Sequence, residues 1–336
     1  MAQIRALLGI LIALCACGAG QAASLFGDQA ALEVTLTGPL SSVTREPRKR
    51  PEHPFEIEVA GQTVKVDVRM RGKSRAEYCG FPPLRLNFAP DSAAGSVFAG
   101  QNKLKLVTHC KGGAEFEQNV LEELMAYRLM SVLTDVSFRT RLLRIRYVDT
   151  DKPNREAVTR FGFVIESDAA FATRIDGEPL LVRDVTRAML DPAHAALVYV
   201  FQYLIGNTDW SLVRYYDDES CCHNGKLFTV NERNYYVPYD FDMSGLVSAR
   251  YAKPKPKLRL RSVRVRRYRG YCIDQAVLRE ALRAVAAQGD DLLRVVAEMP
   301  GLSSRNRQKQ TRYLEDFFAA AREEDKLLKE FERRCL

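Results

Sequence analysis

The first third of the chain alternates apolar and polar residues with the period of a β-strand. The segments ALEVTLTG, FEIEVAG and VKVDVRM lie within residues 31–70, and Gly38 and Gly61 interrupt the alternation. Residues 83–88 and 103–107 continue it. Because side chains of a strand point alternately to its two faces, this region predicts short strands joined by turns, each strand with one buried face.

The apolar period changes to that of a helix over residues 116–133 and returns to strands over residues 139–149 and 156–167. After Ser167 most of the pattern is helical. The elements predicted there are helices over residues 179–190, 193–205, 273–287, 290–298 and 304–333, with a short hairpin formed by residues 226–230 and 235–242.

Strands with one helix followed by helices with one hairpin indicate an α+β protein. The chain has 336 residues, enough for one large domain or two lobes. We therefore expect a β-rich N-lobe over residues 23–167 and a mostly helical C-lobe over residues 168–336, after a leader at residues 1–22.

The leader has the composition of an export signal. Arg5 precedes an apolar stretch that reaches Ala16, and small residues follow it. Cleavage after Ala22 gives an exported protein of the periplasm or cell envelope, and the alternative is a lipoprotein with a lipid anchor at Cys17. No apolar run of about 18 residues follows the leader, so we expect no transmembrane helix in the mature chain.

Export makes disulfides the expected state of the six cysteines in the mature chain. Cys79 and Cys110 both flank extended segments, so they are the predicted pair. The neighbouring residues Cys221 and Cys222 are expected to pair with other cysteines and not with each other. No CxxC spacing occurs, which argues against zinc.

The formal charge of +8 is concentrated in one segment. Residues 253–269 contain nine basic and no acidic residues. This segment alternates like a strand, and we consider either a solvated basic strand or a docking site for an acidic partner or phosphate. We expect no nucleic-acid partner, because the rest of the chain is close to neutral and the protein is predicted to be exported.

Two groups of polar residues follow apolar segments in the second half. An apolar helix runs directly into Asn207-Thr208-Asp209, and Asp240 and Asp242 end an apolar strand. Carboxylates at the end of a buried strand lose hydration unless they bind a cation or hydrogen-bond donors. Oxygen ligands favour magnesium over zinc, so the two aspartates are candidate metal ligands.

The order of these segments resembles the spore-coat-protein-H (CotH) family of atypical protein kinases. The likeness covers roughly residues 65–250, and its motifs are all in order. They are Arg71-Gly72-Lys73-Ser74-Arg75, Lys103-Leu104-Lys105-Leu106, Glu122-Glu123-Leu124-Met125-Ala126-Tyr127, Gly162-Phe163-Val164-Ile165-Glu166, Asn207-Thr208-Asp209, His223-Asn224 and Asp240-Phe241-Asp242.

The resemblance implies a two-lobed protein-kinase-like fold with ATP and Mg²⁺ between the lobes, and transfer of phosphate to Ser or Thr of a protein substrate. It implies that Asp209 is the catalytic base and that Asn224 and Asp240 bind the metal, with Asp242 as an alternate ligand. Phosphoryl transfer needs these parts because the enzyme acts mainly by positioning and by charge neutralisation.

The resemblance also implies the nucleotide site. Lys105 would hold the phosphates and pair with Glu123, Arg71 and Arg75 would lie in the loop over the phosphates, and Glu166 would belong to the same site. The phosphate-binding cation remains open among Lys103, Lys105 and Arg85. A non-catalytic envelope protein on the same scaffold, which binds an acidic partner through residues 253–269, is the alternative function.

Overall fold

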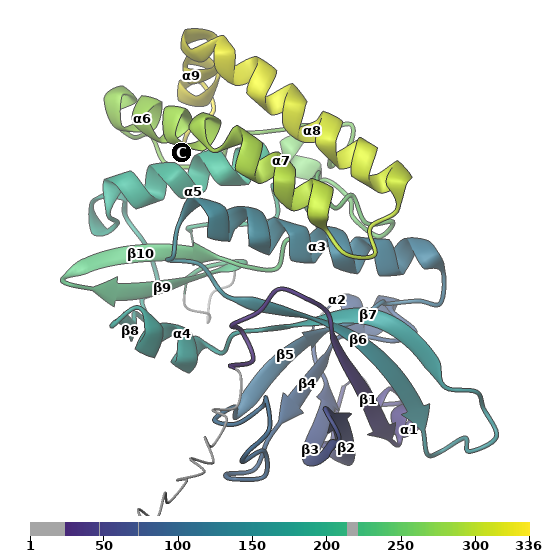
Figure 1. Cartoon of the computed structure of the whole chain (residues 1–336). Helices are drawn as coiled ribbons and strands as arrows, with labels where there is room; N and C mark the ends of the chain where they lie inside the picture. Colours follow the sequence, from purple (N-terminus) through teal and green to yellow (C-terminus); the bar gives the residue numbers. More distant parts are fainter. Residues whose placement is uncertain (1–23, 47, 73, 214–220) are drawn as a thin grey trace, which may run out of the picture.

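Seven strands close into a β-barrel in the first half of the chain (Figure 1). The computed structural model describes residues 24–46, 48–72, 74–213 and 221–336, so the predicted leader and Cys17 lie outside the described residues. The strand order around the barrel is β1-β2-β3-β4-β5-β7-β6. The strands are β1 (Leu32–Gly38), β2 (His53–Val59), β3 (Gln62–Met70), β4 (Leu84–Asn87), β5 (Lys103–Val107), β6 (Thr140–Asp149) and β7 (Val158–Ile165).

The barrel shows that the predicted fold class is wrong. The expected two-lobed kinase-like fold, with a β-rich N-lobe and a helical C-lobe, is replaced by a closed mixed barrel with helices packed on it. Closure depends on the parallel pairing of β1 with β6, in which Leu32 lies opposite Leu143 and Gly38 opposite Asp149. An alternating pattern predicts that a segment is a strand, but it contains no information on which distant strand will pair with it.

The strand alternation predicted for this region is confirmed by burial. In β3 every second side chain, including Val64, Val66 and Val68, points into the barrel, and the residues between them face solvent or are half-buried. The apolar interior excludes water and is the main stabilising contribution of this half.

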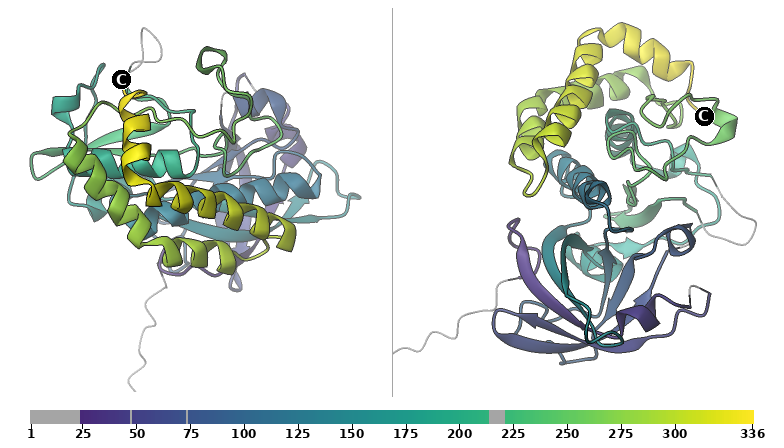
Figure 2. Two further views of the ribbon diagram at one scale, coloured as in Figure 1. Left: turned by 90° about the horizontal axis from the view of Figure 1, so that it is seen from above. Right: turned by 90° about the vertical axis from the view of Figure 1, so that its right-hand side faces the viewer.

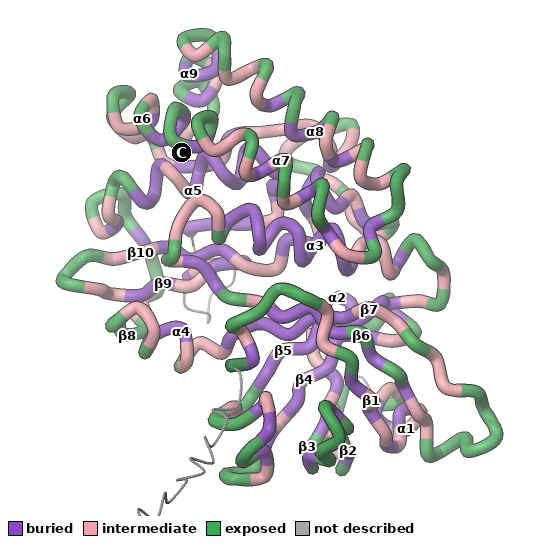
Figure 3. The backbone as a smooth tube through the Cα atoms, viewed as in Figure 1, coloured by how far each residue is buried: buried purple, intermediate pink, exposed green. Residues whose placement is uncertain are grey.

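The helix α3 (Ala114–Leu133) lies between the barrel and the outer helices (Figure 2). It contacts β6 and β7 on one side and α7 on the other. Its residues from Val120 to Met130 are all buried, Glu122 and Glu123 included, which Figure 3 shows as a continuous purple stretch. A helix buried on all sides places any charged side chain it carries in the interior, where the charge needs a partner.

The remaining helices cover α3 and the small sheet. They are α5 (Pro192–Leu204), α6 (Gln275–Ala287), α7 (Gly289–Glu298), α8 (Ser304–Arg322) and α9 (Glu324–Glu332). Three short helices lie elsewhere: α1 (Leu40–Val43) contacts the barrel strands β3 and β6, α2 (Ser74–Tyr78) follows β3, and α4 (Asp168–Arg174) contacts β8. A three-stranded sheet contains β8 (Glu178–Pro179), β9 (Gly225–Val230) and β10 (Arg233–Pro238). Within the described residues, no helix is long and apolar enough to cross a membrane.

Three local predictions are wrong. Residues 179–190 contain only β8 and a short 3₁₀ turn, Arg187–Met189, in place of a helix. Residues 253–269 form no strand: apart from the 3₁₀ turn Pro256–Leu258 they are irregular. The single helix predicted for 304–333 is two helices, because the chain turns at Glu323.

The six described cysteines form three disulfides. Cys79–Cys110 is confirmed, with the two Cα atoms 4.6 Å apart. The expectation for Cys221 and Cys222 is wrong, because these neighbours are bonded to each other. That pairing leaves Cys272–Cys335 as the third bond.

Candidate functional site

A cavity of about 300 Å³ collects most of the residues singled out in the sequence. Four segments line it: the turn after β3 with the start of α2, the residue before β4, the loop between α5 and β9, and the turn after β10. The lining residues are Arg71, Gly72, Ser74, Arg75, Pro83, Asp209, Cys222, His223, Asn224, Tyr239, Asp240, Asp242 and Met243.

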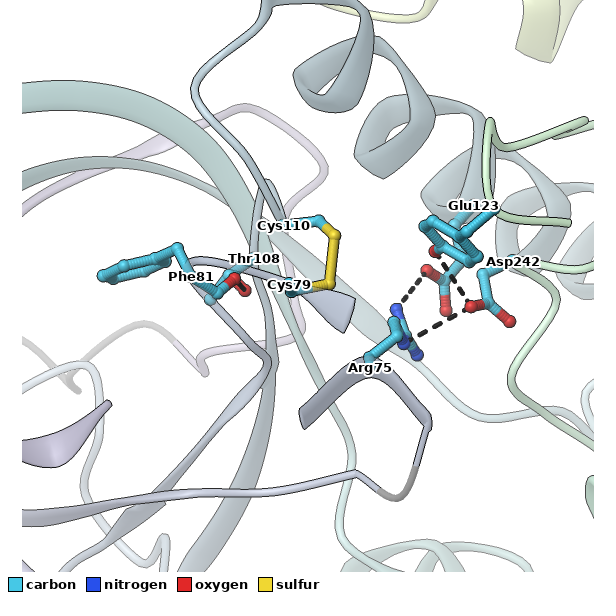
Figure 4. The surroundings of a disulfide bond; sticks show 8 residues. Arg75, Cys79, Phe81, Thr108, Cys110, Glu123 and Asp242 are labelled. Atoms are coloured by element: carbon cyan, nitrogen blue, oxygen red, sulfur yellow. Dashed lines mark hydrogen bonds and ion pairs between the residues drawn. A yellow bond between two sulfur atoms is a disulfide. The ribbon is translucent and has the colours of Figure 1, made fainter. Parts of the chain in front are cut away.

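Arg75 is the central cation of this pocket (Figure 4). Its guanidinium contacts Oε2 of Glu123 at 3.2 Å, Oδ1 of Asp240 at 2.5 Å and Oδ2 of Asp242 at 3.3 Å. Arg75 is only 8% exposed, so these ion pairs lie largely out of water. One guanidinium therefore faces three carboxylates that come from α3 and from the turn after β10.

Burial shifts the pKa values of two of these carboxylates, Glu123 and Asp242, upward. Burial, with the neighbouring Asp242 and Asp240, raises the pKa of Glu123 to about 8 despite the Arg75 charge. Burial likewise raises the pKa of Asp242 to about 6, and Asp240 adds to that shift. The second oxygen of Glu123, Oε1, is buried and has no hydrogen-bond partner. This cluster would gain from additional positive charge.

Asp209 lines the same pocket and is held in its ionised form. His223 Nε2 lies 3.2 Å and Lys255 Nζ 3.0 Å from Oδ1, and Asn224 Nδ2 donates to Oδ2 at 3.0 Å. Burial alone would raise the pKa of Asp209, but the hydrogen bond from His223 and the charge of Lys255 outweigh it and lower that pKa to about 2.

Backbone geometry brings the two acidic turns together. The Gly245 N–H donates to Gly206 O at 3.1 Å, and the Leu246 N–H donates to Ile205 O at 2.9 Å. Gly206 has a φ of +62°, and a Cβ there would lie 2.0 Å from the hydroxyl of Tyr313. Only glycine fits that position, so the turn that leads into Asp209 depends on it.

Asn224 and Asp240 adopt left-handed backbone conformations, with φ of 53° and 61°. Asn and Asp tolerate this region better than other non-glycine residues. The Asp240 N–H donates to the Tyr127 hydroxyl at 2.9 Å, which ties its turn to α3. The amide nitrogen of Asn224 is used by Asp209, so its amide oxygen is the atom that could bind a cation.

The resemblance implied that Lys105 pairs with Glu123, but the two side chains are not paired. Its Nζ lies 3.5 Å from Asp168, and Arg75 takes the Glu123 carboxylate. Lys105 also lies over the ring of Tyr239, 4.9 Å from the centroid. Burial lowers the pKa of Lys105 to about 8, although Asp168 opposes that shift.

The other two candidates for the phosphate-binding cation lie in the same region of the barrel wall. Arg85 is the cross-strand neighbour of Lys105 on one side and of Arg69 on the other. Burial, together with Arg69 and Arg71, lowers the pKa of Arg85. Lys103 is exposed. A row of cations therefore runs along the barrel wall beside the pocket.

Glu166 lies apart from the pocket. Arg174 holds both of its oxygens, at 2.9 and 2.8 Å, and the Arg139 N–H donates to Oε2 at 3.1 Å. This ion pair joins the end of β7 to α4. The structure therefore does not place Glu166 with the other predicted site residues.

The structure adds residues that sequence reasoning missed. Lys255 contacts Asp209, Tyr251 donates its hydroxyl proton to Asp242 at 2.9 Å, and Asp168 pairs with both Lys105 and Lys226. Lys255 belongs to the basic segment, so its charge was visible but its position was not. Tyr251 and Asp168 belong to no motif or periodic pattern that would have marked them in the sequence.

Three arginines of the basic segment donate hydrogen bonds to the backbone near the site. Arg266 donates to Leu204 O at 3.2 Å, Arg264 to Gly245 O at 3.2 Å, and Arg269 to Thr208 O. These carbonyls belong to the last residue of α5 and to the two turns that present Asp209 and Asp242. The carbonyls next to the segment accept hydrogen bonds from its arginine side chains and not from its backbone N–H groups. The segment therefore forms no strand.

Across the described ranges, no group of three or more His, Cys, Asp or Glu side chains is arranged to hold a metal ion. Asp240 and Asp242 lie in the lining of the same cavity. Magnesium usually takes one or two protein carboxylates and completes its shell with water and phosphate oxygens.

The chain was compared with protein families, curated proteins and solved structures. No protein-family model and no curated protein matches this chain. A solved structure, the Helicobacter pylori proinflammatory kinase CtkA, is similar over 84% of this chain and 91% of its own, at 9% identity and a TM-score of 0.37. That score is too low to establish a common fold, and membership of the CotH family is not shown.

Proposed function

We propose that this protein is a CotH-like phosphotransferase that binds ATP with Mg²⁺ in the pocket and transfers phosphate to a hydroxyl of a protein Ser or Thr. The observation that carries the proposal is the convergence of Asp209, Asn224 and Asp240 on one cavity, beside a row of cations on the barrel wall. Asp209 and Asn224 come from the loop between α5 and β9, and Asp240 comes from the turn after β10. Phosphoryl transfer requires this set of groups.

The charge distribution supports a polyphosphate ligand. The pocket lining contains the carboxylates Asp209, Asp240 and Asp242 and the cations Arg71 and Arg75, and Arg75 is paired with Asp240 and Asp242. Lys105 lies beside Tyr239, which lines the same cavity. A polyphosphate bound to a divalent cation presents negative and positive charge at once, so it complements a lining that carries both.

The donor set fits magnesium. Asp240 and Asn224 offer oxygen atoms, and Asp242 lies next to them in the same cavity. The carboxylate cluster already binds a guanidinium and has one buried oxygen, Glu123 Oε1, without a partner. When bound, Mg²⁺ would neutralise charge on the transferred phosphate.

Asp209 is suited to position the acceptor hydroxyl. With a pKa of about 2 it is ionised at neutral pH, so it accepts a hydrogen bond from the acceptor hydroxyl. It receives the hydroxyl proton as that oxygen bonds to the γ-phosphorus of ATP and the bond from phosphorus to the β,γ-bridging oxygen breaks, which releases ADP. His223, Asn224 and Lys255 fix the direction of its two oxygens. The base therefore needs no rearrangement to meet its substrate.

The decisive experiment is titration calorimetry with ATP, with and without Mg²⁺, on wild type and single-residue variants. We expect Mg²⁺-dependent binding that is lost in Asp240→Asn and kept in Asp209→Asn, whereas phosphate transfer is abolished in Asp209→Asn. Asp67→Asn, which neutralises an exposed aspartate of β3, is the matched control and should behave as wild type.

Tryptophan fluorescence gives a second readout. Trp210 is the only tryptophan, is buried, and donates its Nε1–H to Asn207 O at 3.1 Å, so it reports on the turn that carries Asp209. Absence of any response to millimolar ATP and Mg²⁺ in both measurements would reject the enzyme and leave the non-catalytic alternative.

A further inference from the structure

Two arginine-bearing segments far apart in the sequence form one groove on the helical half. Its cavity of about 660 Å³ is lined by Val265, Arg266, Arg267, Glu330, Arg333 and Arg334. The groove shares no lining residue with the pocket that contains Asp209. It is therefore a separate site, and a ligand could bind there whether or not the protein is a phosphotransferase.

The two segments are covalently joined next to the groove. Cys272 and Cys335 form a disulfide with a Cα–Cα distance of 4.9 Å. The Leu336 N–H donates to Gly270 O at 3.0 Å, and the Cys272 N–H donates to Leu336 O at 3.2 Å. The arginines are thus held in place before any ligand arrives, which lowers the entropy cost of binding.

One of the four arginines that line the groove is bonded to the protein interior, and the other three have no carboxylate partner among the described residues. Arg266 is turned inward: it donates to Leu204 O and Tyr313 O, and its guanidinium lies 3.8 Å from the Tyr313 ring centroid. Arg333 and Arg334 are exposed and Arg267 is half-buried. Within the described part of the chain, none of these three forms an ion pair with a carboxylate.

Positive charge in the groove is poorly compensated. Glu330 is the only acidic residue in its described lining, and it accepts a hydrogen bond from the Tyr203 hydroxyl at 3.3 Å. Like charges held close together repel one another, and a disulfide beside them prevents the segments from moving apart. An anionic ligand with several charges would relieve this repulsion.

We propose that this groove is a docking site for an acidic peptide segment of a partner protein, bound through its carboxylates by Arg267, Arg333 and Arg334. Guanidinium groups pair with carboxylates through two parallel hydrogen bonds, which gives both strength and direction. A nucleic-acid duplex is disfavoured, since such binding draws on a wider surface of phosphate contacts than three arginines provide. This proposal places the acidic partner in one groove, whereas the sequence analysis considered the whole basic segment 253–269.

The test is fluorescence anisotropy with a labelled hexaglutamate peptide on the disulfide-intact full chain. We expect wild type to bind, and the triple variant Arg267→Ala, Arg333→Ala, Arg334→Ala to bind roughly 10- to 100-fold more weakly, from exposed ion pairs of typical strength. The binding of wild type should also weaken as salt is raised.

The matched control removes the same charge elsewhere. Arg155, Arg305 and Arg312 are exposed arginines outside the groove, and their triple alanine variant should bind the peptide as wild type does. Circular dichroism of both variants establishes that they are folded. A hexaglutamine peptide should show no binding to any of the three proteins.

Two results would overturn the proposal. Equal losses in the groove variant and the control variant would mean that the peptide responds only to net charge. Binding of tripolyphosphate to the groove without binding of hexaglutamate would mean that the site recognises a small phosphate compound and not an acidic peptide.

Discussion

Replacing Arg75 with methionine should strongly destabilise the protein. The substitution keeps an unbranched side chain of similar reach and removes the guanidinium that contacts Glu123, Asp240 and Asp242. Glu123 and Asp242 are 2% and 5% exposed, so they would remain buried without a counter-charge. Removing one partner of a buried ion pair costs about 3–5 kcal/mol of unfolding free energy.

Two features of the cluster place the expected loss at the lower end of that range. The Asp240 side chain is 31% exposed, so water compensates part of its charge. The pKa of Glu123 is raised to about 8, so at pH 7 most of this carboxyl is already protonated. We expect a loss of about 3 kcal/mol at pH 7.

Urea unfolding with the disulfides intact measures this loss, from the midpoint and the slope of each transition. The deficit of Arg75→Met should shrink between pH 8 and pH 5, because protonation of Glu123 and Asp242 removes the charges that need the guanidinium. Adding Glu123→Gln to the variant should recover part of the loss. A deficit below about 1 kcal/mol, or one that does not change with pH, would refute the interpretation of this cluster.

Three further predictions concern pH and covalent structure. The pKa of Glu123 is raised from 4.5 to about 8, so its contribution to stability is complete below pH 4.5 and is lost as pH rises through 8. Midpoints of urea unfolding should show that loss in wild type and less of it in Glu123→Gln. The pKa of Asp209 is lowered from 3.8 to about 2, so its contribution to stability is present above pH 3.8 and disappears as pH falls through 2. Acid unfolding of Asp209→Asn should lack this pH-dependent loss of stability. Replacing Cys79 and Cys110 with alanine opens a loop with a sequence separation of 31 and should cost about 2–4 kcal/mol in urea unfolding, and an unchanged midpoint would contradict a stabilising role for the bond.

Local structure could be predicted wherever a segment carries its own periodic pattern. The strands of residues 31–70 and the helix beginning near Phe116 follow from the spacing of apolar residues, because burial of one face depends only on neighbours along the chain. Residues 179–190 lack such a consistent period, and their structure is set by contacts with β9 and with Asn234. The helix predicted there from the pattern after Ser167 is therefore absent.

The residues of the candidate site could be found in the sequence, but their partners could not. Asp209, Asn224 and Asp240 stand out because they follow apolar segments, and the structure brings them into one cavity. Whether Lys105 or another cation would reach Glu123 depends on how the turn after β3 folds over α3. The disulfide Cys79–Cys110 follows directly after α2 and positions Arg75 for that contact.

The sequence by itself determined most of the strands and helices, where charge is concentrated, and which polar residues lie at the ends of apolar elements. Only the tertiary structure decided that β1 pairs with β6 to close the barrel, that Cys221 bonds to Cys222, and that the basic segment is folded against the backbone of the site. The physical reason is that pairing across long sequence separations depends on the sum of many contacts, whereas the apolar period of one element is the same in any arrangement of its neighbours.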